Sequence, residues 1–265
     1  MIFMILNLPN LLWKSSKMKF DIKNKTFLIF GANGLLGKKL TEELLSHGAK
    51  IYAADINFSK DKVFQHKNLK VLNININNLD QVEGLFKGDI MFDGAVNCTY
   101  PRNNNYGKSF FDVAVEDFNE NISMNLGGVF LFSRCCANYF IKRKTPFSLV
   151  NIASIYGVIS PKFEIYDDTK MTMPIEYSAI KSSLIHLSKY ITSYINNSDF
   201  RINCVSPGGI FDNQEKNFLE AYKRNTFGTG MLEAEDVCGT VLFLLSDASK
   251  FINGQNIIID DGYTL

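Results

Sequence analysis

The stretch Thr26–Gly37 reads TFLIFGANGLLG and joins a short apolar run to a glycine-rich turn. The apolar run, Thr26–Phe30, does not alternate with polar residues, which is typical of a strand that is buried on both faces of a parallel sheet. Leucines then recur at the spacing of one helix face over residues 35–48, where a glycine ends the pattern. A strand, a glycine turn and a helix in this order predict the first half of a βαβ unit.

The rest of the chain continues this alternation of short apolar runs and longer periodic segments. Further strands are expected at residues 51–55, 71–74, 91–96, 147–154, 201–206 and 256–260, and long helices at 115–144 and 174–196. We therefore predict a single α/β domain over residues 24–265, with a Rossmann-like, doubly wound parallel sheet and helices on both faces. In such a sheet the ligand site lies at the carboxyl ends of the strands.

Composition excludes several classes of partner. The 28 Lys and Arg residues nearly balance 27 Asp and Glu residues, so the net charge of +1 predicts neither nucleic acid nor a membrane surface as a partner. Five cysteines, an odd number without C-x-x-C spacing, favour the reducing cytoplasm over a disulfide framework. Three histidines without ligand spacing predict no metal site.

Residues 1–23 are interpreted as an N-terminal extension that precedes the domain. The apolar segment Met1–Trp13 is shorter than the roughly 20 residues that a membrane-spanning helix needs. Its lysines follow the apolar run, whereas a secretory signal has its basic residues in front. A simple alternative is that translation starts at Met18, in which case residues 1–17 do not belong to the native protein.

The glycines of the opening stretch, Gly31, Gly34 and Gly37, have the spacing and the position of a dinucleotide-binding turn. Such glycines let the backbone approach a pyrophosphate, and the N-terminus of the following helix attracts its negative charge. Asp55 ends the second strand, where a carboxylate accepts hydrogen bonds from ribose hydroxyls and repels a 2′-phosphate. NAD is therefore preferred over NADP as the cofactor. The alternatives are an ordinary loop and an aspartate that only caps a strand.

Together with later motifs, this turn makes residues 24–265 resemble the short-chain dehydrogenase/reductase family. The family's motifs appear in order as SMNLGGVF, VNIASIYG, YSAIK, NCVSPGGIFDN and the C-terminal NGQNIIIDDGYTL. The resemblance implies four catalytic residues: Asn125, Ser154, Tyr177 and Lys181. It implies that Tyr177 exchanges a proton with the substrate oxygen while hydride moves to or from nicotinamide. Lys181 is then expected to lower the pKa of Tyr177, Ser154 to bind the same oxygen, and Asn125 to hold a water.

The resemblance also implies a set of cofactor contacts, with some departures from the family pattern. The family's N-N-A-G after the fourth strand is replaced by Asn97-Cys98-Thr99-Tyr100, so we expect extra bulk near the cofactor. Asn75 stands where an aspartate usually contacts the adenine, and its amide can still donate and accept. The expected contacts are Gly31, Asn33, Gly34, Leu35, Leu36, Gly37, Asp55, Asn75, Ile76, Asn97, Cys98, Tyr177, Lys181, Pro207, Gly208 and Ile210.

Two Tyr-x-x-x-Lys patterns compete for the catalytic position. Tyr166 lies at the usual family distance from the catalytic serine, but Pro174 disfavours a helix immediately before it, so Tyr166 and Lys170 are not expected to share a helix face. Tyr177 and Lys181 begin a segment with an apolar stripe, and a proline suits the first turn of that helix. We therefore assign the chemistry to Tyr177 and Lys181.

This choice leaves an insertion, residues 160–174, that must loop out near the substrate. The insertion and the loop after the fourth strand are rich in donors and acceptors, which suits a polyhydroxylated or anionic small molecule such as a sugar or sugar phosphate. The candidate substrate contacts are Arg102, Tyr156, Lys162, Tyr166 and Lys170. The alternative is that these charges are solvated or contact another subunit. The whole sequence also resembles oxidoreductases of bacterial surface-glycan and flagellin-glycosylation clusters, including those for legionaminic acid.

Two other functions remain open at this point. The glycine spacing is also found in nucleotide-sugar epimerases and dehydratases that retain NAD, although those enzymes have a larger C-terminal domain. A non-catalytic, NADH-sensing binding protein is the other alternative. The family resemblance further implies a cytoplasmic homotetramer or homodimer that associates through the helices at 115–144 and 174–196.

Overall fold

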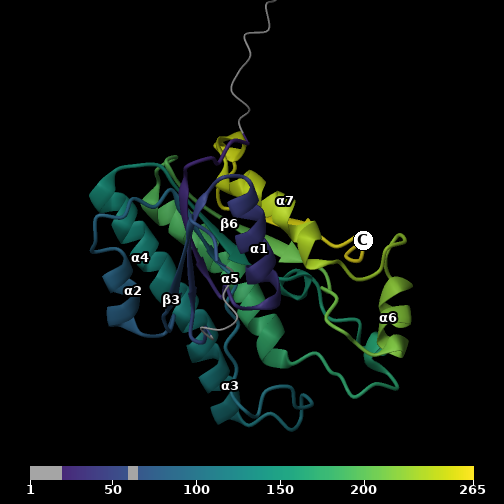
Figure 1. Cartoon of the computed structure of the whole chain (residues 1–265). Coiled ribbons are helices and arrows are strands. Elements are labelled where there is room, and N and C mark those ends of the chain that lie inside the picture. The colour runs from purple at the N-terminus through teal and green to yellow at the C-terminus, as the bar shows by residue number, and fades with distance from the viewer. Residues whose placement is uncertain (1–19, 59–64) are drawn as a thin grey trace, which may run out of the picture.

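The computed structural model describes residues 20–58 and 65–265 (Figure 1). The proposed start at Met18 and most of the extension 1–23 lie outside these residues. Ile22, which precedes the expected start of the domain, is buried in the core. No helix in the described part of the chain has both the length and the apolar character to span a bilayer.

The described residues form one parallel sheet of seven strands in the order β3-β2-β1-β4-β5-β6-β7. The predicted doubly wound α/β fold is therefore confirmed, with strand ends that differ from the prediction by a few residues. The strands are β1 (Thr26–Phe30), β2 (Lys50–Asp55), β3 (Leu69–Asn73), β4 (Gly94–Asn97), β5 (Phe147–Ile152), β6 (Phe200–Pro207) and β7 (Asn256–Ile259).

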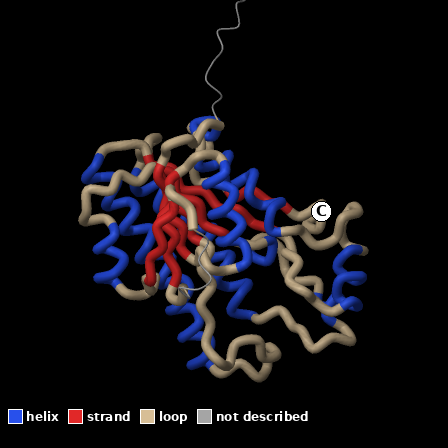
Figure 2. The backbone as a smooth tube through the Cα atoms, in the orientation of Figure 1, coloured by secondary structure: helices blue, strands red, loops and turns tan. Residues whose placement is uncertain are grey.

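Helices cover both faces of the sheet, as the tube in Figure 2 shows. The cluster that contains α1 and α7 packs on one face, and the cluster that contains α2, α4 and α5 packs on the other. The α-helices are α1 (Leu35–Ser46), α2 (Leu79–Leu85), α3 (Val115–Ile122), α4 (Gly128–Arg143), α5 (Ile175–Ile195), α6 (Lys216–Lys223) and α7 (Ala234–Leu245). Shorter turns are the π-helix η2 (Ser123–Gly127) and the 3-10 helices η3 (Ile155–Gly157), η4 (Phe163–Tyr166) and η5 (Asp247–Ser249).

Strand β1 is buried on both faces, as its continuous apolar run predicts. Phe27 and Ile29 belong to the core cluster under α1 and α7, whereas Leu28 and Phe30 belong to the cluster under α2 and α4. This division follows from the alternation of side chains along a strand. Strand β1, in the opening stretch, thus contributes to both halves of the core.

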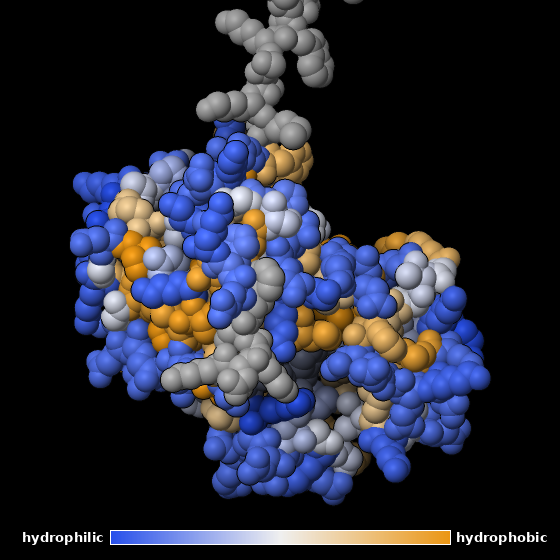
Figure 3. Space-filling model, viewed as in Figure 1, coloured by the Kyte–Doolittle hydropathy of each residue, from blue (hydrophilic) through white to orange (hydrophobic). Residues whose placement is uncertain are grey.

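Outside the core, most of the face seen in Figure 3 is hydrophilic.

The helix that was predicted for residues 115–144 is interrupted by a single π-helical turn. This turn, η2, contains Asn125 and separates α3 from α4. The periodicity of the sequence does not reveal such a turn. A π turn contains one residue more than an α-helical turn, and this changes the spacing of apolar residues only near the turn. Single π turns inside α-helices occur mostly at functional sites.

The core helix α7 is absent from the sequence prediction, as are α2 and α6. A usable signal was present, because Glu233 and Asp236 form a capping box at the start of α7. Without α7, one face of the sheet would lack much of its cover. This helix packs on α1 and on β5 and β6.

The strand order reverses between β1 and β4, which are hydrogen-bonded neighbours although β2 and β3 lie between them in the chain. Segments that leave these two strands must run in opposite directions across the sheet. A crevice therefore opens above their carboxyl ends, which is where ligands bind in open α/β sheets.

Candidate active site

The glycine turn after β1 is shaped to receive a pyrophosphate. Gly31 has a φ of +75°, and a Cβ there would lie 2.8 Å from the carbonyl carbon of Cys98. A Cβ at Gly37 would overlap the carbonyl oxygen of Gly31. Helix α1 has Gly34 as its N-cap, with no side-chain cap and no acidic residue in its first turn. The first backbone N–H groups of α1 are therefore available to an anion.

Asp55 lies at the carboxyl end of β2, beside this turn. Its Oδ2 accepts a hydrogen bond from the backbone N–H of Asn33 at 3.0 Å, which fixes the carboxylate against the turn. Asp55 lines a cavity of about 510 Å³, which we call the cofactor cleft. Of the expected cofactor contacts, those that line the cleft are Gly31, Gly34, Asp55, Asn75, Ile76 and Cys98. The turn, the cleft and the carboxylate fit a dinucleotide.

Other expected cofactor contacts support the cleft rather than line it. The Oδ1 of Asn97 accepts hydrogen bonds from the N–H and the hydroxyl of Thr99, so Asn97 shapes the turn after β4. Leu36 is buried in the core and Leu35 is exposed. The expected contacts that line neither this cleft nor the pocket beside Tyr177 are Asn33, Leu35, Leu36, Gly37, Asn97 and Lys181.

Tyr177 and Lys181 lie one turn apart on α5, so the helix that was predicted for this pair is confirmed. Tyr166 instead ends a 3-10 turn, and Lys170 lies outside any helix. The Nζ of Lys181 is 5.5 Å from the centre of the Tyr177 ring and donates to the carbonyl oxygen of Ile152 at 2.8 Å. Ser154, the N-cap of η3, also has its hydroxyl at Tyr177. The structure therefore brings three of the four expected catalytic side chains together.

The pKa of Tyr177 is raised, because burial of the phenol outweighs its hydrogen bond with Ser154, which lowers the pKa. Lys181 is not among the groups that shift this pKa: its ammonium donates to a backbone carbonyl, and the expectation that its charge lowers the pKa of Tyr177 stays a prediction. Burial also lowers the pKa of Lys181, to about 8. Near neutral pH the pair therefore consists of a neutral phenol next to an ammonium ion.

Asn125 and Tyr100 complete this side of the site. The Nδ2 of Asn125 donates to the carbonyl oxygens of Pro101 and Asn121, so the π turn is tied to the loop after β4. The ring of Tyr100 meets the ring of Tyr177 edge-on at 5.0 Å, and the Nζ of Lys181 lies 5.0 Å from its centre. Tyr100 is the bulk that the loss of the family's glycine predicts. The role of Asn125 in holding a water stays a prediction.

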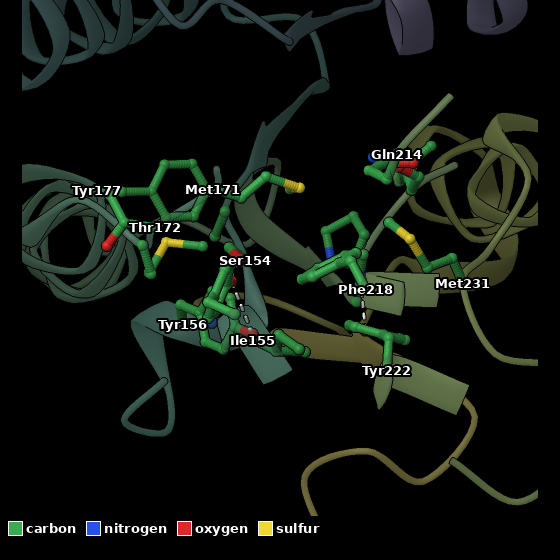
Figure 4. A pocket seen from close by; sticks show the side chains of 17 residues that line it. Ser154, Ile155, Tyr156, Met171, Thr172, Tyr177, Gln214, Phe218, Tyr222 and Met231 are labelled. Carbon is green, nitrogen blue, oxygen red and sulfur yellow. Dashed lines mark hydrogen bonds between the residues drawn. The ribbon is translucent and has the colours of Figure 1, made fainter. Parts of the chain in front are cut away.

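A second cavity, of about 270 Å³, lies on the other side of Tyr177, and we call it the substrate pocket. Figure 4 shows Tyr177 of α5 on one side of the pocket, Ser154 in the middle, and Phe218 and Tyr222 of α6 on the other side. Expected residues that line it are Ser154, Tyr156, Tyr166, Tyr177, Pro207, Gly208 and Ile210. Residues that the sequence analysis missed include Met171, Thr172, Met173, Gln214, Phe218, Tyr222 and Met231.

A network of tyrosines forms the floor of this pocket. The hydroxyl of Tyr166 donates to that of Tyr156 at 3.3 Å, and the hydroxyls of Tyr156 and Tyr263 are 3.2 Å apart. The rings of Tyr222 and Tyr263 stack at 4.6 Å. The insertion, helix α6 and the C-terminal segment therefore meet below the substrate pocket, and burial raises the pKa of each of these tyrosines.

The charged residues that were expected to contact the substrate lie elsewhere. Arg102 lines the cofactor cleft. The Nζ of Lys162 donates to the carbonyl oxygen of Tyr263 at 3.1 Å, and Lys170 is exposed. Among the described residues no Lys, Arg, Asp or Glu lines the substrate pocket, so Arg102, Lys162 and Lys170 do not belong to its wall, whereas Tyr156 and Tyr166 do. Loop charges point to water or to backbone carbonyls because an unpaired buried charge is costly.

Comparison with known proteins agrees with this geometry. A family model described as enoyl-(acyl carrier protein) reductase matches residues 31–264. Post-translational flagellin modification protein A of Campylobacter coli is 35% identical, over 92% of this chain and 100% of that protein. The 7alpha-hydroxysteroid dehydrogenase of Bacteroides fragilis is 26% identical, over 92% of this chain and 95% of that protein.

A solved structure extends the likeness to the whole fold. The short chain dehydrogenase of Leptospira borgpetersenii, with bound NAD+, superposes with a TM-score of 0.84 at 29% identity, over 100% of this chain and 99% of that chain. The glycine turn, the Ser154, Tyr177 and Lys181 cluster and these relatives agree with one another. The chain therefore belongs to the short-chain dehydrogenase/reductase family and is an oxidoreductase that acts on a CH–OH group.

Proposed function

We propose that the protein is an NAD-dependent oxidoreductase that interconverts a secondary alcohol and a ketone on a sugar during surface-glycan biosynthesis. The observation that carries this proposal is the lining of the substrate pocket. It is free of charged side chains among the described residues, and it combines aromatic rings with hydroxyl and amide groups around Tyr177. Aromatic rings pack against the apolar face of a sugar ring, and the polar groups bind its hydroxyls.

The nicotinamide of the bound cofactor accepts or supplies the hydride. The chain's own part is proton transfer and positioning. Tyr177 is protonated near neutral pH, so its hydroxyl can donate to a ketone oxygen, and the Ser154 hydroxyl beside it binds the same oxygen. In the opposite direction Tyr177 must take a proton from an alcohol. The positive charge of Lys181, present below about pH 8, favours the phenolate that this step needs.

The preference for NAD over NADP rests on Asp55. Its carboxylate is fixed at the end of β2 and lines the cofactor cleft, where it would accept hydrogen bonds from ribose hydroxyls. A 2′-phosphate at the same place would meet a negative charge. The NAD+ bound to the relative from Leptospira borgpetersenii supports the same preference.

The size of the pocket and the flagellin-modifying relative support a sugar substrate. A cavity of about 270 Å³ holds a small ring rather than an extended chain. If the substrate carries a phosphate, that group would lie outside the pocket, because Lys162 and Lys170 do not line it. We place the reaction in the cytoplasm, and the free thiols of all five cysteines support this location.

A screen for reduction of NAD+ tests the proposal. The full chain is incubated with NAD+ and with matched panels of free sugars, sugar phosphates, nucleotide sugars and lipophilic secondary alcohols, and NADH is followed by its absorbance. We expect NADH to form with one or more sugar compounds. NADH formation with lipophilic alcohols and with no sugar would reject the substrate class. Conversion of a nucleotide sugar without net NADH would favour an epimerase or dehydratase, and cofactor binding without any turnover would favour a sensor.

A further inference from the structure

Arg102 lies in the loop after β4 and is not one of the cofactor contacts that the family resemblance implies. It lines the cofactor cleft together with Gly31, Gly34 and Asp55, and it does not line the substrate pocket. Among the described residues it is the one Lys or Arg in the lining of the cleft. The lining of the cleft therefore includes one cationic side chain, Arg102, and one carboxylate, Asp55.

The guanidinium of Arg102 is not neutralised by a carboxylate. Within the described ranges no Asp or Glu oxygen lies within 4.0 Å of it, whereas Lys108 of the same loop pairs with Asp117 at 3.2 Å. Arg102 instead lies over the ring of Tyr106, with its central carbon 5.8 Å from the ring centre. A guanidinium on an aromatic face is held in place but keeps its N–H donors for a ligand.

The loop that carries Arg102 is fixed on both sides. The backbone N–H of Asn103 donates to Asn121 at 3.0 Å, and its Nδ2 donates to Asp117 at 3.0 Å. The hydroxyls of Tyr106 and Tyr100 are 3.0 Å apart. Because Tyr100 also packs against the catalytic tyrosine, a continuous series of rings joins Arg102 to the reacting centre. The backbone beside Arg102 is thus fixed by the fold, and the exposed Arg102 side chain is held only by its contact with Tyr106.

The negative charge of a bound pyrophosphate needs a positive group in the cofactor cleft. A dinucleotide brings a doubly charged pyrophosphate, and the glycine turn offers it only neutral backbone donors and the partial charge of a helix end. One of the turn's donors, the N–H of Asn33, is already taken by Asp55, which adds a further negative charge. Arginine binds phosphate oxygens with charge-assisted and often bidentate hydrogen bonds.

We propose that Arg102, from the loop after β4, binds the pyrophosphate of the dinucleotide. This role rests on the cofactor assignment in the proposed function, and it replaces the earlier expectation that Arg102 binds an anionic substrate. The residue then contributes to cofactor affinity, and its effect follows the pyrophosphate rather than the adenine, the 2′-position or the substrate.

The test is calorimetric titration of the full chain with ADP-ribose, adenosine, NAD+ and NADP+. The variants are Arg102→Ala and Arg102→Lys, and the matched control is Lys108→Ala in the same loop. We expect Arg102→Ala to weaken ADP-ribose and NAD+ about tenfold, as for the loss of a hydrogen bond to a charged group. Arg102→Lys should lose less of its affinity for ADP-ribose and NAD+, and Lys108→Ala should have the affinity of the wild type. Adenosine should bind equally well to the wild type and to all three variants.

Several results would overturn the role of Arg102. One is an unchanged affinity of Arg102→Ala for ADP-ribose. Another is a loss of affinity for adenosine as large as the loss for ADP-ribose, which would indicate a distorted loop. A loss for NADP+ alone would assign Arg102 to a 2′-phosphate. Slower sugar turnover with intact ADP-ribose binding would return it to the substrate. If the wild type does not bind ADP-ribose, the cofactor assignment fails as a whole, so the two failures are distinguishable.

Discussion

Lys181 has an environment that is unusual for a lysine side chain. Its ammonium is buried, hydrogen-bonded to the carbonyl oxygen of Ile152, and has a pKa lowered to about 8 by burial. A buried cation without a carboxylate partner costs stability that a purely structural residue would not cost. We infer that the charge is retained for its effect on Tyr177.

This cost predicts a dependence of stability on pH. Between pH 8 and 10.5 the folded chain has lost the Lys181 proton and the unfolded chain still holds it, so the free energy of unfolding rises with pH. The gain across this range is on the order of 3 kcal/mol for the 2.5-unit difference. In Lys181→Met the gain should disappear, and turnover should fall. Urea denaturation of both proteins at several pH values measures this gain, and equal pH profiles would contradict the lowered pKa of Lys181.

At the scale of single residues, the sequence was sufficient wherever a motif fixes a position. Tyr177 and Lys181 could be chosen over Tyr166 and Lys170 because Pro174 separates the two pairs into different local structures. Gln214 and Tyr222 could not be found, since they reach the substrate pocket from α6 and its preceding loop. Only tertiary packing places them there, and nothing in their local sequence indicates it.

At the scale of elements, the contact between η3 and α5 holds Ser154 beside Tyr177, the two residues proposed to bind the reacting oxygen. A Cβ at Gly157 of η3 would lie 2.6 Å from the carbonyl carbon of Lys181 and 2.9 Å from the backbone nitrogen of Ser182. Both atoms belong to the backbone of α5, which cannot move aside cheaply. The absence of a side chain at Gly157 therefore sets the distance between the two elements.

Gly157→Ala should push η3 away from α5 and destabilise the chain by about 1 to 3 kcal/mol, as overpacking usually does. The rate should also fall, because Ser154 moves away from Tyr177. Gly239→Ala is the matched control: no atom lies within 4 Å of a Cβ there, and alanine should stabilise the exposed position in α7 by up to about 1 kcal/mol. Denaturant unfolding distinguishes the two, and equal stability of Gly157→Ala and wild type would refute the close contact.

The elements differ in how clearly their sequences indicate them. Strand β1 could be assigned because an uninterrupted apolar run of this length fits a doubly buried strand. The π turn at Ser123–Gly127 could not, because its residues continue the helical pattern on both sides. Helix α7 was not predicted, although the two residues of its capping box, Glu233 and Asp236, are present in the sequence at the required spacing.

At the scale of the whole molecule, the reversal of strand order brings the two cavities together. The cofactor cleft lies above β1 and β4, and the substrate pocket lies above β5 and β6, with Tyr177 and Tyr100 in contact between them. The alternation of elements predicted a ligand site at the carboxyl ends of the strands, but neither the two cavities nor the uncharged character of the substrate pocket. That character depends on where the loop charges of the insertion turn, and only the packed structure determines it.

The expected association of subunits belongs to the same scale and stays a prediction. Phe130 of α4 and Tyr190 of α5 are exposed and line a largely apolar hollow together with Leu126 and Leu187. Apolar residues gathered on the surface in this way are typical of contacts between subunits. They lie on the two helices that the sequence analysis named for a homodimer or homotetramer.

We propose that Tyr177 transfers the proton in an NAD-dependent oxidation of a sugar alcohol. The most direct test is the rate of NADH formation by the wild type, Tyr177→Phe and Tyr166→Phe with NAD+ and the same sugar panel. We predict NADH formation by the wild type, a loss of about 100-fold or more in Tyr177→Phe with unchanged NAD+ binding, and most of the rate retained in Tyr166→Phe. A Tyr177→Phe variant that forms NADH as fast as the wild type would rule out proton transfer by Tyr177.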